Sequence, residues 1–245
     1  MKLKSKMKVI TVKCLDDNFS YIVLDEKNNN ACVIDPSEAQ PIIKVVKRER
    51  INLRYILNTH HHYDHVGGNL ELKKEFNCNV LGFINDRENI PGIEIFVKDN
   101  ELYQNEDFEF ITYHTPGHTI GHVIFHFHKQ NFLFTGDTLF SLGCGKIFEG
   151  SYEQMYNSLN KIKKLPKNTM IYFGHEYTKN NYEFCLLNDP ENIQLKTKIK
   201  KIDKLLNIRK PTTPSKLMEE LQSNIFLKSE NLETFKKLRN LKDNF

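Results

Sequence analysis

Over the first 177 residues, short runs of β-branched and aromatic residues recur between polar segments, which is the pattern of β-strands. Helices fit three other segments better, and in two of them Ser37 with Gln40 and Ser151 with Gln154 match the capping box of a helix start. Groups of strands followed by helices predict two packed sheets with helices outside. We predict strands at 9–12, 21–24, 31–34, 55–57, 108–113, 123–127, 132–134 and 170–173, and helices at 37–50, 69–76 and 151–164.

After residue 177 the pattern changes, because apolar residues recur at intervals of three and four, as on one face of a helix. We predict an α+β fold in which a domain of residues 1–177 precedes an α-helical domain of residues 178–245. The prolines of segment 209–214 predict a loop between the helices of this second domain. Those helices are predicted at 180–189, 191–206, 214–222 and 231–242.

The composition is that of a soluble globular protein, with 39% hydrophobic and 27% charged residues. No apolar run approaches the length of a membrane span, and the basic segment 1–8 lacks the apolar stretch of a signal peptide. The five cysteines are scattered and form no CxxC pair, which fits a reducing compartment. A cytoplasmic protein with no membrane partner is therefore predicted.

The formal net charge of +4 is too small to suggest nucleic-acid binding, so no nucleic-acid partner is predicted. The placement of the charge is more informative than its size. Residues 179–245 hold 14 Lys+Arg against 9 Asp+Glu, so the positive excess of the chain lies in this tail.

The strongest chemical signal is the HxHxDH pattern of segment 59–65, directly after the predicted strand 55–57. In a turn at a strand end, alternate residues project the same way, so His60 and His62 can face one metal ion. Asp64 and His65 can then turn back towards a second ion. The glycines at 67 and 68 permit a sharp entry into the next helix.

Three later fragments complete such a site, because His118, Asp137 and His175 each follow a predicted strand or apolar run. Together with the first segment they supply five histidines and two aspartates. A catalytic metal pair uses imidazole nitrogens and few carboxylates, one of which can bridge. The pattern predicts two metal ions that share Asp137 and a water molecule.

The other five histidines are not assigned to metal. His61 lies between two predicted ligands and is expected to point away from them. His114 precedes a turn, and its role is left open. Because His122, His126 and His128 alternate with apolar residues, they are predicted to form the solvated face of a strand.

With these motifs the chain resembles glyoxalase II, the hydroxyacylglutathione hydrolase family of the metallo-β-lactamase superfamily. The resemblance covers nearly the whole chain, and the later motifs narrow it to this family. It implies an αββα sandwich of two mixed β-sheets with outer helices, followed by a helical C-terminal domain. The motifs are THHHxDHxGGN at 59–69, TPGHTxGH at 115–122, GDTLF at 136–140, GCGKxxEG at 143–150 and GHEYT at 174–178.

The resemblance implies a division of the metal ligands. His60, His62 and His118 would hold one ion, and Asp64, His65 and His175 would hold the other, with Asp137 as the bridge. Asp64, His65 and Asp137 are the catalytic candidates within this set. Asp35 lies where the superfamily keeps an aspartate that orients the ligands, although a turn-forming Asp-Pro pair is an alternative.

The same resemblance implies a glutathione site, because basic and tyrosyl residues stand at the matching positions. Cationic donors suit glutathione, which carries two carboxylates. Phe148 stands where some relatives carry tyrosine, so one hydrogen bond is expected to be missing. The lysines at 196, 198, 200 and 201 are instead expected to lie on a solvated helix face. The implied substrate-binding residues are Lys146, Phe148, Tyr177, Arg239 and Lys242.

The implied reaction is hydrolysis of S-D-lactoylglutathione to D-lactate and glutathione, by a hydroxide that bridges two divalent metal ions. This is the second step of methylglyoxal detoxification. Zinc suits the nitrogen-rich ligand set, with iron or manganese as alternatives. Cys144 is expected to be a small packed residue rather than a nucleophile, and the protein is expected to be a monomer.

Three alternatives stay open: a sulfur dioxygenase of the same fold with a single iron, a nuclease of the fold, and a non-catalytic binding module stiffened by metal. The predicted helical tail counts against the dioxygenase. The lack of a large basic arm counts against the nuclease. Metal content measured together with thiol release separates these possibilities.

Overall fold

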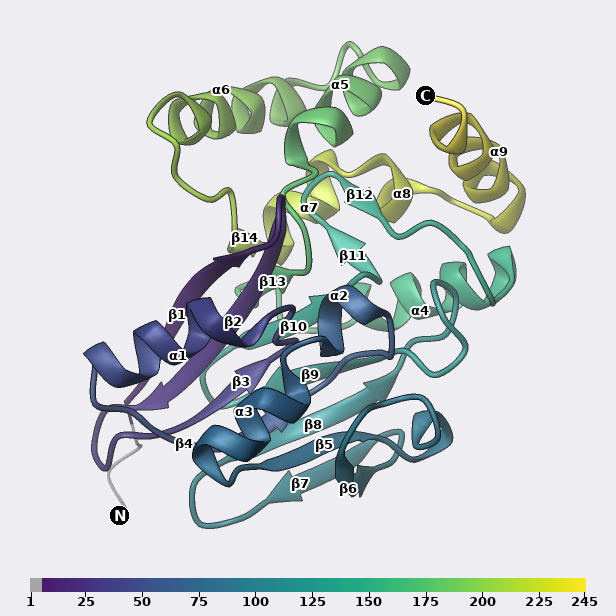
Figure 1. The fold of residues 1–245 in the computed structure, drawn as a ribbon. Helices are drawn as coiled ribbons and strands as arrows, with labels where there is room; N and C mark the ends of the chain where they lie inside the picture. Colours follow the sequence, from purple (N-terminus) through teal and green to yellow (C-terminus); the bar gives the residue numbers. More distant parts are fainter. Residues whose placement is uncertain (1–5) are drawn as a thin grey trace. The chain divides into compact units, whose positions relative to one another are not determined.

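The structure, a computed structural model, describes residues 6–245 and divides into two compact units. The first unit runs up to Tyr113 and includes Phe125–Gln130, while the second comprises His114–Ile124 and Asn131–Phe245. Figure 1 shows the elements of both. Most of the basic amino-terminal segment lies outside the described residues, and the cytoplasmic location stays a prediction.

The first unit contains a six-stranded mixed sheet whose strands follow one another in chain order. The first three strands are antiparallel neighbours, and from β3 to β6 the pairing is parallel. Helices α1 and α3 lie over one face of this sheet (Figure 1), where Ile42 and Leu72 pack with Ile56 in the core. The strands are β1 (Met7–Cys14), β2 (Asn18–Asp25), β3 (Asn30–Ile34), β4 (Asn52–Leu57), β5 (Asn79–Phe83) and β6 (Ile93–Val97); the helices are α1 (Ala39–Arg48), α2 (Tyr63–Val66), α3 (Asn69–Phe76) and the 3-10 turn η1 (Ile84–Asp86).

The later strands form a second six-stranded sheet with the order β14-β13-β10-β9-β8-β7. Its pairs are again mixed, since β10 and β13 are parallel while β7 and β8, and β13 and β14, are antiparallel. A separate small hairpin joins β11 to β12. The strands are β7 (Glu101–Gln104), β8 (Glu109–His114), β9 (Val123–Phe127), β10 (Phe132–Gly136), β11 (Leu139–Phe140), β12 (Gly143–Cys144), β13 (Met170–Phe173) and β14 (Ser215–Lys216).

The second unit also holds most of the helices. Helix α9 packs on α4 through the rings of Tyr156 and Phe235, whose centroids are 5.8 Å apart, and through a hydrogen bond from the Tyr152 hydroxyl to Asn240. Asparagine side chains cap α6, α8 and α9 by accepting from backbone N–H groups of the first turn. The helices are α4 (Tyr152–Lys163), α5 (Thr178–Asn188), α6 (Ile193–Asn207), α7 (Leu217–Ser223), α8 (Ile225–Lys228) and α9 (Leu232–Asp243).

The predicted strands and helices are found, with shifts at the ends. The capping box at Ser151 and Gln154 is confirmed. The one at Ser37 is wrong: α1 begins two residues later, and Glu38 precedes it without capping it because its carboxylate accepts from the Leu15 N–H at 2.8 Å. The helix predicted from residue 214 starts only at Leu217, because the two residues before it pair with β13.

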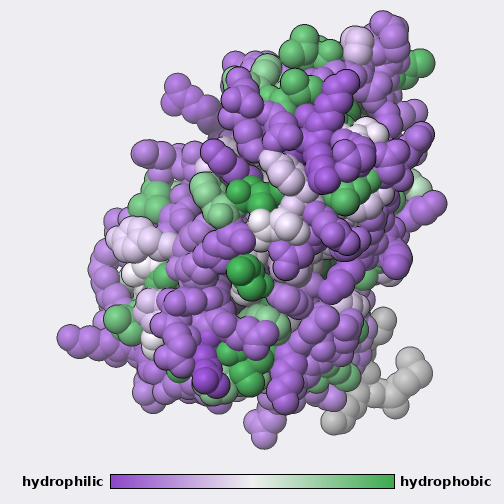
Figure 2. Space-filling model, turned by 90° about the vertical axis from the view of Figure 1, so that its right-hand side faces the viewer, coloured by the Kyte–Doolittle hydropathy of each residue, from purple (hydrophilic) through white to green (hydrophobic). Residues whose placement is uncertain are grey.

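Hydrophilic side chains predominate on the face drawn in Figure 2, where hydrophobic residues form small separate patches. The large apolar side chains lie mainly inside, among them Phe110, Phe125 and Phe134, as burial of apolar area requires. Within residues 6–245, no helix has both the length and the apolar character needed to span a membrane.

Candidate metal centre

In the first unit, the chain leaves β4 after Leu57 and carries three imidazoles into one cluster. The ring centroids of His60 and His62 are 4.7 Å apart, and those of His60 and His65 are 4.2 Å apart. Helix α2 carries Asp64 and His65 side by side, with Oδ2 of the carboxylate 3.6 Å from Nε2 of the imidazole. The four candidate ligands of the HxHxDH segment therefore lie together in this unit.

Asp35, which follows β3, orients two histidines of this cluster through hydrogen bonds. Its Oδ1 accepts from the Thr59 N–H at 2.7 Å, and its Oδ2 accepts from the Thr59 hydroxyl at 2.7 Å and lies 3.1 Å from Nδ1 of His65. Because the Thr59 hydroxyl donates its proton to Asp35, its oxygen can accept a hydrogen bond from Nδ1 of His60, which is 3.0 Å away. Both imidazoles thereby carry their protons on Nδ1, which makes Nε2 the nitrogen that can bind a metal.

A turn-forming role alone therefore does not account for Asp35. The residue does adopt a left-handed backbone conformation, with φ of 48°, but its buried carboxylate serves the histidine cluster. Asn18 adds a support that the sequence analysis did not assign. Its side-chain amide donates to the carboxylate of Asp64 at 2.9 Å and to the backbone carbonyl of the same residue at 3.0 Å.

The glycines after the cluster act through close packing rather than an unusual turn. The two glycines form the turn between α2 and α3, and Gly67 has ordinary helical dihedral angles there, with φ of −58°. A Cβ atom at Gly67 would lie 2.5 Å from the Ser37 carbonyl oxygen, and one at Gly68 would lie 2.9 Å from that of Pro36. Only glycine lets this segment approach the backbone that follows Asp35.

In the second unit, Asp137 lies between two imidazoles. Its Oδ2 is 3.5 Å from Nε2 of His118 and 3.3 Å from Nε2 of His175. Ligands on one tetrahedral zinc ion, each about 2.1 Å from the metal, are separated by about 3.4 Å. The donor atoms of this second cluster therefore have the types and spacing of metal ligands.

A backbone contact orients His118. Its Nδ1 donates to the Lys146 carbonyl oxygen at 2.7 Å, which again leaves Nε2 for a metal. Gly145 makes that approach possible, because a Cβ atom there would lie 1.9 Å from the Asp137 carbonyl oxygen and 3.1 Å from Nδ1 of His118.

His122 and His126 correct the prediction of a solvated strand face, because both are buried. All five residues of β9 are buried, so this strand has no exposed face on which the alternation could place polar groups. His122 supports the metal cluster, since its Nε2 accepts from the Asp137 N–H at 3.1 Å. Burial lowers the pKa of His126 to about 4, which keeps that imidazole neutral. His128 is only partly exposed.

The two remaining histidines make local contacts. His61 turns its Nδ1 to the carboxylate of Asp86 at 2.9 Å. His114, whose role the sequence left open, has its Nε2 2.7 Å from the Ile120 carbonyl oxygen.

The second unit also contains a cavity of about 350 Å³ lined by residues from distant parts of the sequence. Four of the five predicted substrate-binding residues line it. Phe148 is not among them: it is 62% exposed, and Nζ of Lys146 lies 5.7 Å from the centre of its ring. The lining comprises Phe140, Cys144, Lys146, Tyr177, Asn180, Asn181, Arg239 and Lys242.

Three cations line this cavity, Lys146, Arg239 and Lys242, and the last two are held by contacts with neighbouring residues. Arg239 is buried, donates from Nη1 to the Cys144 carbonyl oxygen at 2.8 Å and pairs through Nη2 with Asp243 at 2.9 Å. Lys242 donates to the Asn180 carbonyl oxygen at 3.1 Å. Burial, with a smaller effect from the nearby Arg239, lowers the pKa of Lys242 to about 8.

A ring contact links the cavity to the candidate metal ligands of this unit. Tyr177, which lines the cavity, stacks on His175 with the ring centroids 4.6 Å apart and the planes 6° from parallel. Cys144 is buried, and burial raises the pKa of its thiol, which agrees with the expectation of a packed residue.

Lys198 does not lie on the solvated helix face predicted for it. It is buried and paired with Glu220, whereas Lys196, Lys200 and Lys201 are exposed as expected.

Two family models together match nearly the whole chain. Residues 15–175 match the model of the metallo-β-lactamase superfamily, and residues 176–245 match that of the hydroxyacylglutathione hydrolase C-terminus. The hydroxyacylglutathione hydrolase of Pelagibacter ubique is 56% identical over 98% of this chain and 100% of its own length. The chain belongs to the hydroxyacylglutathione hydrolase family. The hydroxyacylglutathione hydrolase of Rhodospirillum rubrum is 40% identical over 92% of this chain and 88% of its own length.

Solved structures agree with the family assignment at the level of the fold. The crystal structure of ETHE1 from Myxococcus xanthus superposes with a TM-score of 0.73, at 21% identity, over 96% of this chain and 90% of that one. The predicted metallo-β-lactamase fold of the α+β class, with its C-terminal helices, is confirmed.

Membership of the hydroxyacylglutathione hydrolase family, together with the clustered histidines and aspartates, supports a dinuclear centre for divalent metal ions. The identity of the metal and the assignment of each ligand are proposals. The boundary at residues 177 and 178 and the monomeric state also stay predictions.

Proposed function

We propose that this chain hydrolyses the thioester bond of S-(2-hydroxyacyl)glutathiones, S-D-lactoylglutathione in particular, to glutathione and a 2-hydroxy acid. The observation that carries the proposal is the cavity of the second unit, which brings Lys146, Arg239 and Lys242 together although they are up to 96 positions apart. Glutathione offers carboxylates to such cations. The high identity to hydroxyacylglutathione hydrolases supports the same substrate class.

As the family resemblance implies, His60, His62 and His118 would hold one ion, and Asp64, His65 and His175 would hold the other. Asp137 would supply its carboxylate to both. A ligand set with five imidazoles suits zinc, and iron and manganese are the alternatives. The chemistry that a bound metal pair supplies is polarisation of the thioester carbonyl and activation of water at neutral pH.

The side chains around these ligands hold and orient them. Asp35 and the Lys146 carbonyl fix the protons of His65 and His118 on Nδ1, so the reactive arrangement exists before substrate binds. Lys146, Arg239 and Lys242 hold the glutathione moiety, and Tyr177 lines the cavity beside His175. The departing thiolate needs no strong acid, because a thiol has a pKa of only about 8.5.

A direct test combines the purified protein with S-D-lactoylglutathione and measures the release of free thiol together with the metal content per chain. We expect thiol release that rises with metal content up to two ions per chain. Failure to release thiol with two ions bound would overturn the proposal. Oxygen consumption supported by a single iron, without thiol release, would favour the sulfur dioxygenase alternative instead.

Because Lys242 titrates near neutral pH, we expect KM to depend on pH. With a pKa of about 8, the ammonium is protonated at pH 7 and mostly neutral at pH 9. A carboxylate needs the charged form, so KM should rise by up to about tenfold between these pH values, in proportion to the lost charged fraction. In the Lys242→Arg variant the charge persists over this range, so its KM should stay nearly flat. An equal rise in both proteins would assign the titration to another group.

A further inference from the structure

The hairpin β11–β12 forms one wall of the proposed glutathione cavity. Phe140 and Cys144 line the cavity from this hairpin, and Lys146 follows two residues later. At the hairpin turn, Leu142 is fully buried and has a left-handed backbone with φ of 58°. A branched residue adopts this conformation only where its surroundings impose it.

Side chains from the C-terminal helices hold the backbone of this hairpin. Asn181 donates to the Ser141 carbonyl oxygen at 3.1 Å, and Cys185 donates to that of Leu142 at 3.1 Å. Asn224 donates to the Gly143 carbonyl oxygen at 3.1 Å. Arg239 donates to the next carbonyl, that of Cys144. Successive peptide groups of the hairpin are therefore fixed by α5, by the N-cap residue of α8 and by α9.

Glu220 of α7 makes the matching contact to an N–H group. Its Oε2 accepts from the Leu142 N–H, the donor at the strained turn, at 2.8 Å. Its Oε1 accepts from the Ser215 hydroxyl at 2.5 Å and from Nζ of Lys198. The carboxylate is fully buried, and such a charge is costly unless it is paired and hydrogen-bonded, as it is here.

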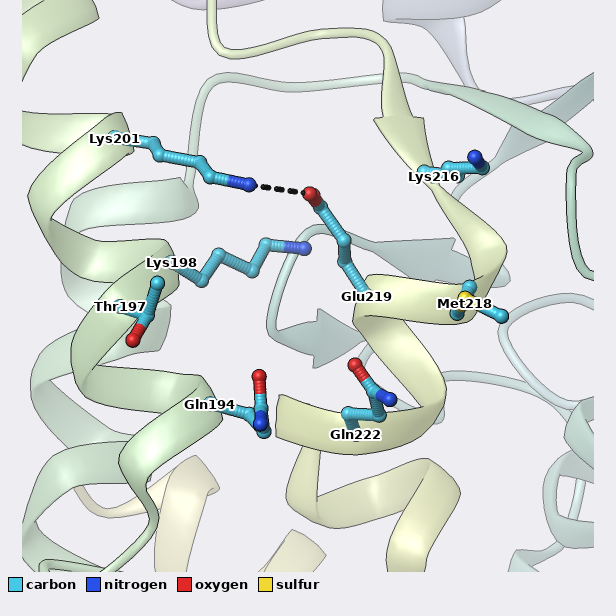
Figure 3. Close-up of a pocket in the computed structure, with 8 residues that line it drawn as sticks. All are labelled: Gln194, Thr197, Lys198, Lys201, Lys216, Met218, Glu219 and Gln222. Carbon is cyan, nitrogen blue, oxygen red and sulfur yellow. Dashed lines mark hydrogen bonds and ion pairs between the residues drawn. The ribbon is translucent and has the colours of Figure 1, made fainter.

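The partner of Glu220 reaches in from another helix. Figure 3 shows Lys198 extending from α6 towards α7, beside a second pair in which Lys201 meets Glu219. Lys198 is 5% exposed, whereas Lys201 is exposed and Glu219 is partly exposed. Neither Lys198 nor Glu220 lines the cavity that holds Arg239 and Lys242.

We propose that Glu220 is a positioning residue for the substrate site. Its hydrogen bond to the Leu142 N–H holds the β11–β12 hairpin in the conformation that presents Phe140, Cys144 and Lys146 to the glutathione moiety. Lys198 supplies the charge that lets a carboxylate be buried at this place. The inference relies on the proposed function only for the identity of the ligand in the cavity.

Two double variants separate the hydrogen bond from the charge pair. Both carry Lys198→Met, so neither leaves a buried ammonium. In combination with Glu220→Gln the side chain keeps an oxygen that can accept from the Leu142 N–H, whereas in combination with Glu220→Met it does not. Glu219→Gln, the neighbouring position on α7, is the matched surface control.

We expect KM for S-D-lactoylglutathione to be about three- to tenfold higher in K198M/E220M than in K198M/E220Q, the effect of one hydrogen bond. The change in kcat should be smaller, and the metal content should be equal in the two proteins. Glu219→Gln should match the wild type. Equal KM values in the two double variants, or a KM difference accompanied by metal loss, would overturn the positioning role.

Hydrogen exchange of the peptide covering residues 139–146 provides a readout that needs no substrate. The wild type should protect the Leu142 amide, and K198M/E220M should lose protection there while K198M/E220Q keeps it. If K198M/E220M does not fold, unprotected exchange of Leu142 in the wild type would still refute the proposal. If the wild type hydrolyses no thioester but shows this exchange pattern, the proposed function fails and the positioning role stands.

Discussion

The Asp137→Ala variant should lose thioester hydrolysis by at least about a thousandfold, because a bridging ligand matters more than the outer partners whose loss costs 10–100-fold. The carboxylate oxygen that lies 3.3 Å and 3.5 Å from two imidazole nitrogens has no substitute among the neighbouring side chains of its cluster. The variant should also bind fewer than two metal ions per chain. Both quantities are measured on the same sample, by thiol release and elemental analysis.

Asp203→Ala is a suitable control for the loss of a carboxylate. Asp203 lies on α6 and accepts a hydrogen bond from the Tyr182 hydroxyl at 3.0 Å, away from the histidines of this unit. Its removal should leave both turnover and metal content unchanged. Unaltered turnover in Asp137→Ala would refute the assignment of the bridging ligand.

The Arg239→Ala variant should raise KM by about 10- to 100-fold, the range for loss of a charge-assisted hydrogen bond, while kcat falls by less than about threefold. Arg239 contributes one of the three positive charges of the cavity and, through its bond to the Cys144 carbonyl, the shape of one wall. Both effects act on binding and not on the reacting atoms. Steady-state kinetics with S-D-lactoylglutathione measure the two constants.

Lys236→Ala is the matched control, because it removes one positive charge three residues earlier on the same helix. Lys236 pairs with Glu233 at 2.9 Å and does not line the cavity. Its KM should be close to that of the wild type. A large fall in kcat at constant KM in Arg239→Ala would contradict a role confined to binding.

Local patterns in the sequence suffice to predict several parts of the site. A turn after a strand end brings His60, His62 and the Asp64–His65 pair into one cluster, and short-range geometry suffices to predict that. Asp137 and His175 likewise follow strand ends that β-branched and aromatic residues mark. Residues a few positions apart fix each of these placements.

The errors fall where a partner lies far away along the chain. Lys198 occupies the buried face of α6 between Leu195 and Ile202, which helical periodicity could have indicated. Nothing local names Glu220 as its partner, 22 positions later. His126 alternates with apolar residues as a surface strand would, and only the burial of both faces of β9 reverses that interpretation.

By itself, the sequence determined the class of the fold, the main helices and strands, the family and the set of candidate ligands. These features depend on hydrophobic periodicity and on motifs of a few consecutive residues. The tertiary structure alone decided which of its two possible roles Asp35 has, that Gly67 serves close backbone packing, and that helices α5, α7 and α9 together with Asn224 hold the β11–β12 hairpin. The physical reason is that hydrogen bonding and steric contact depend on distance in space, which sequence separation does not encode.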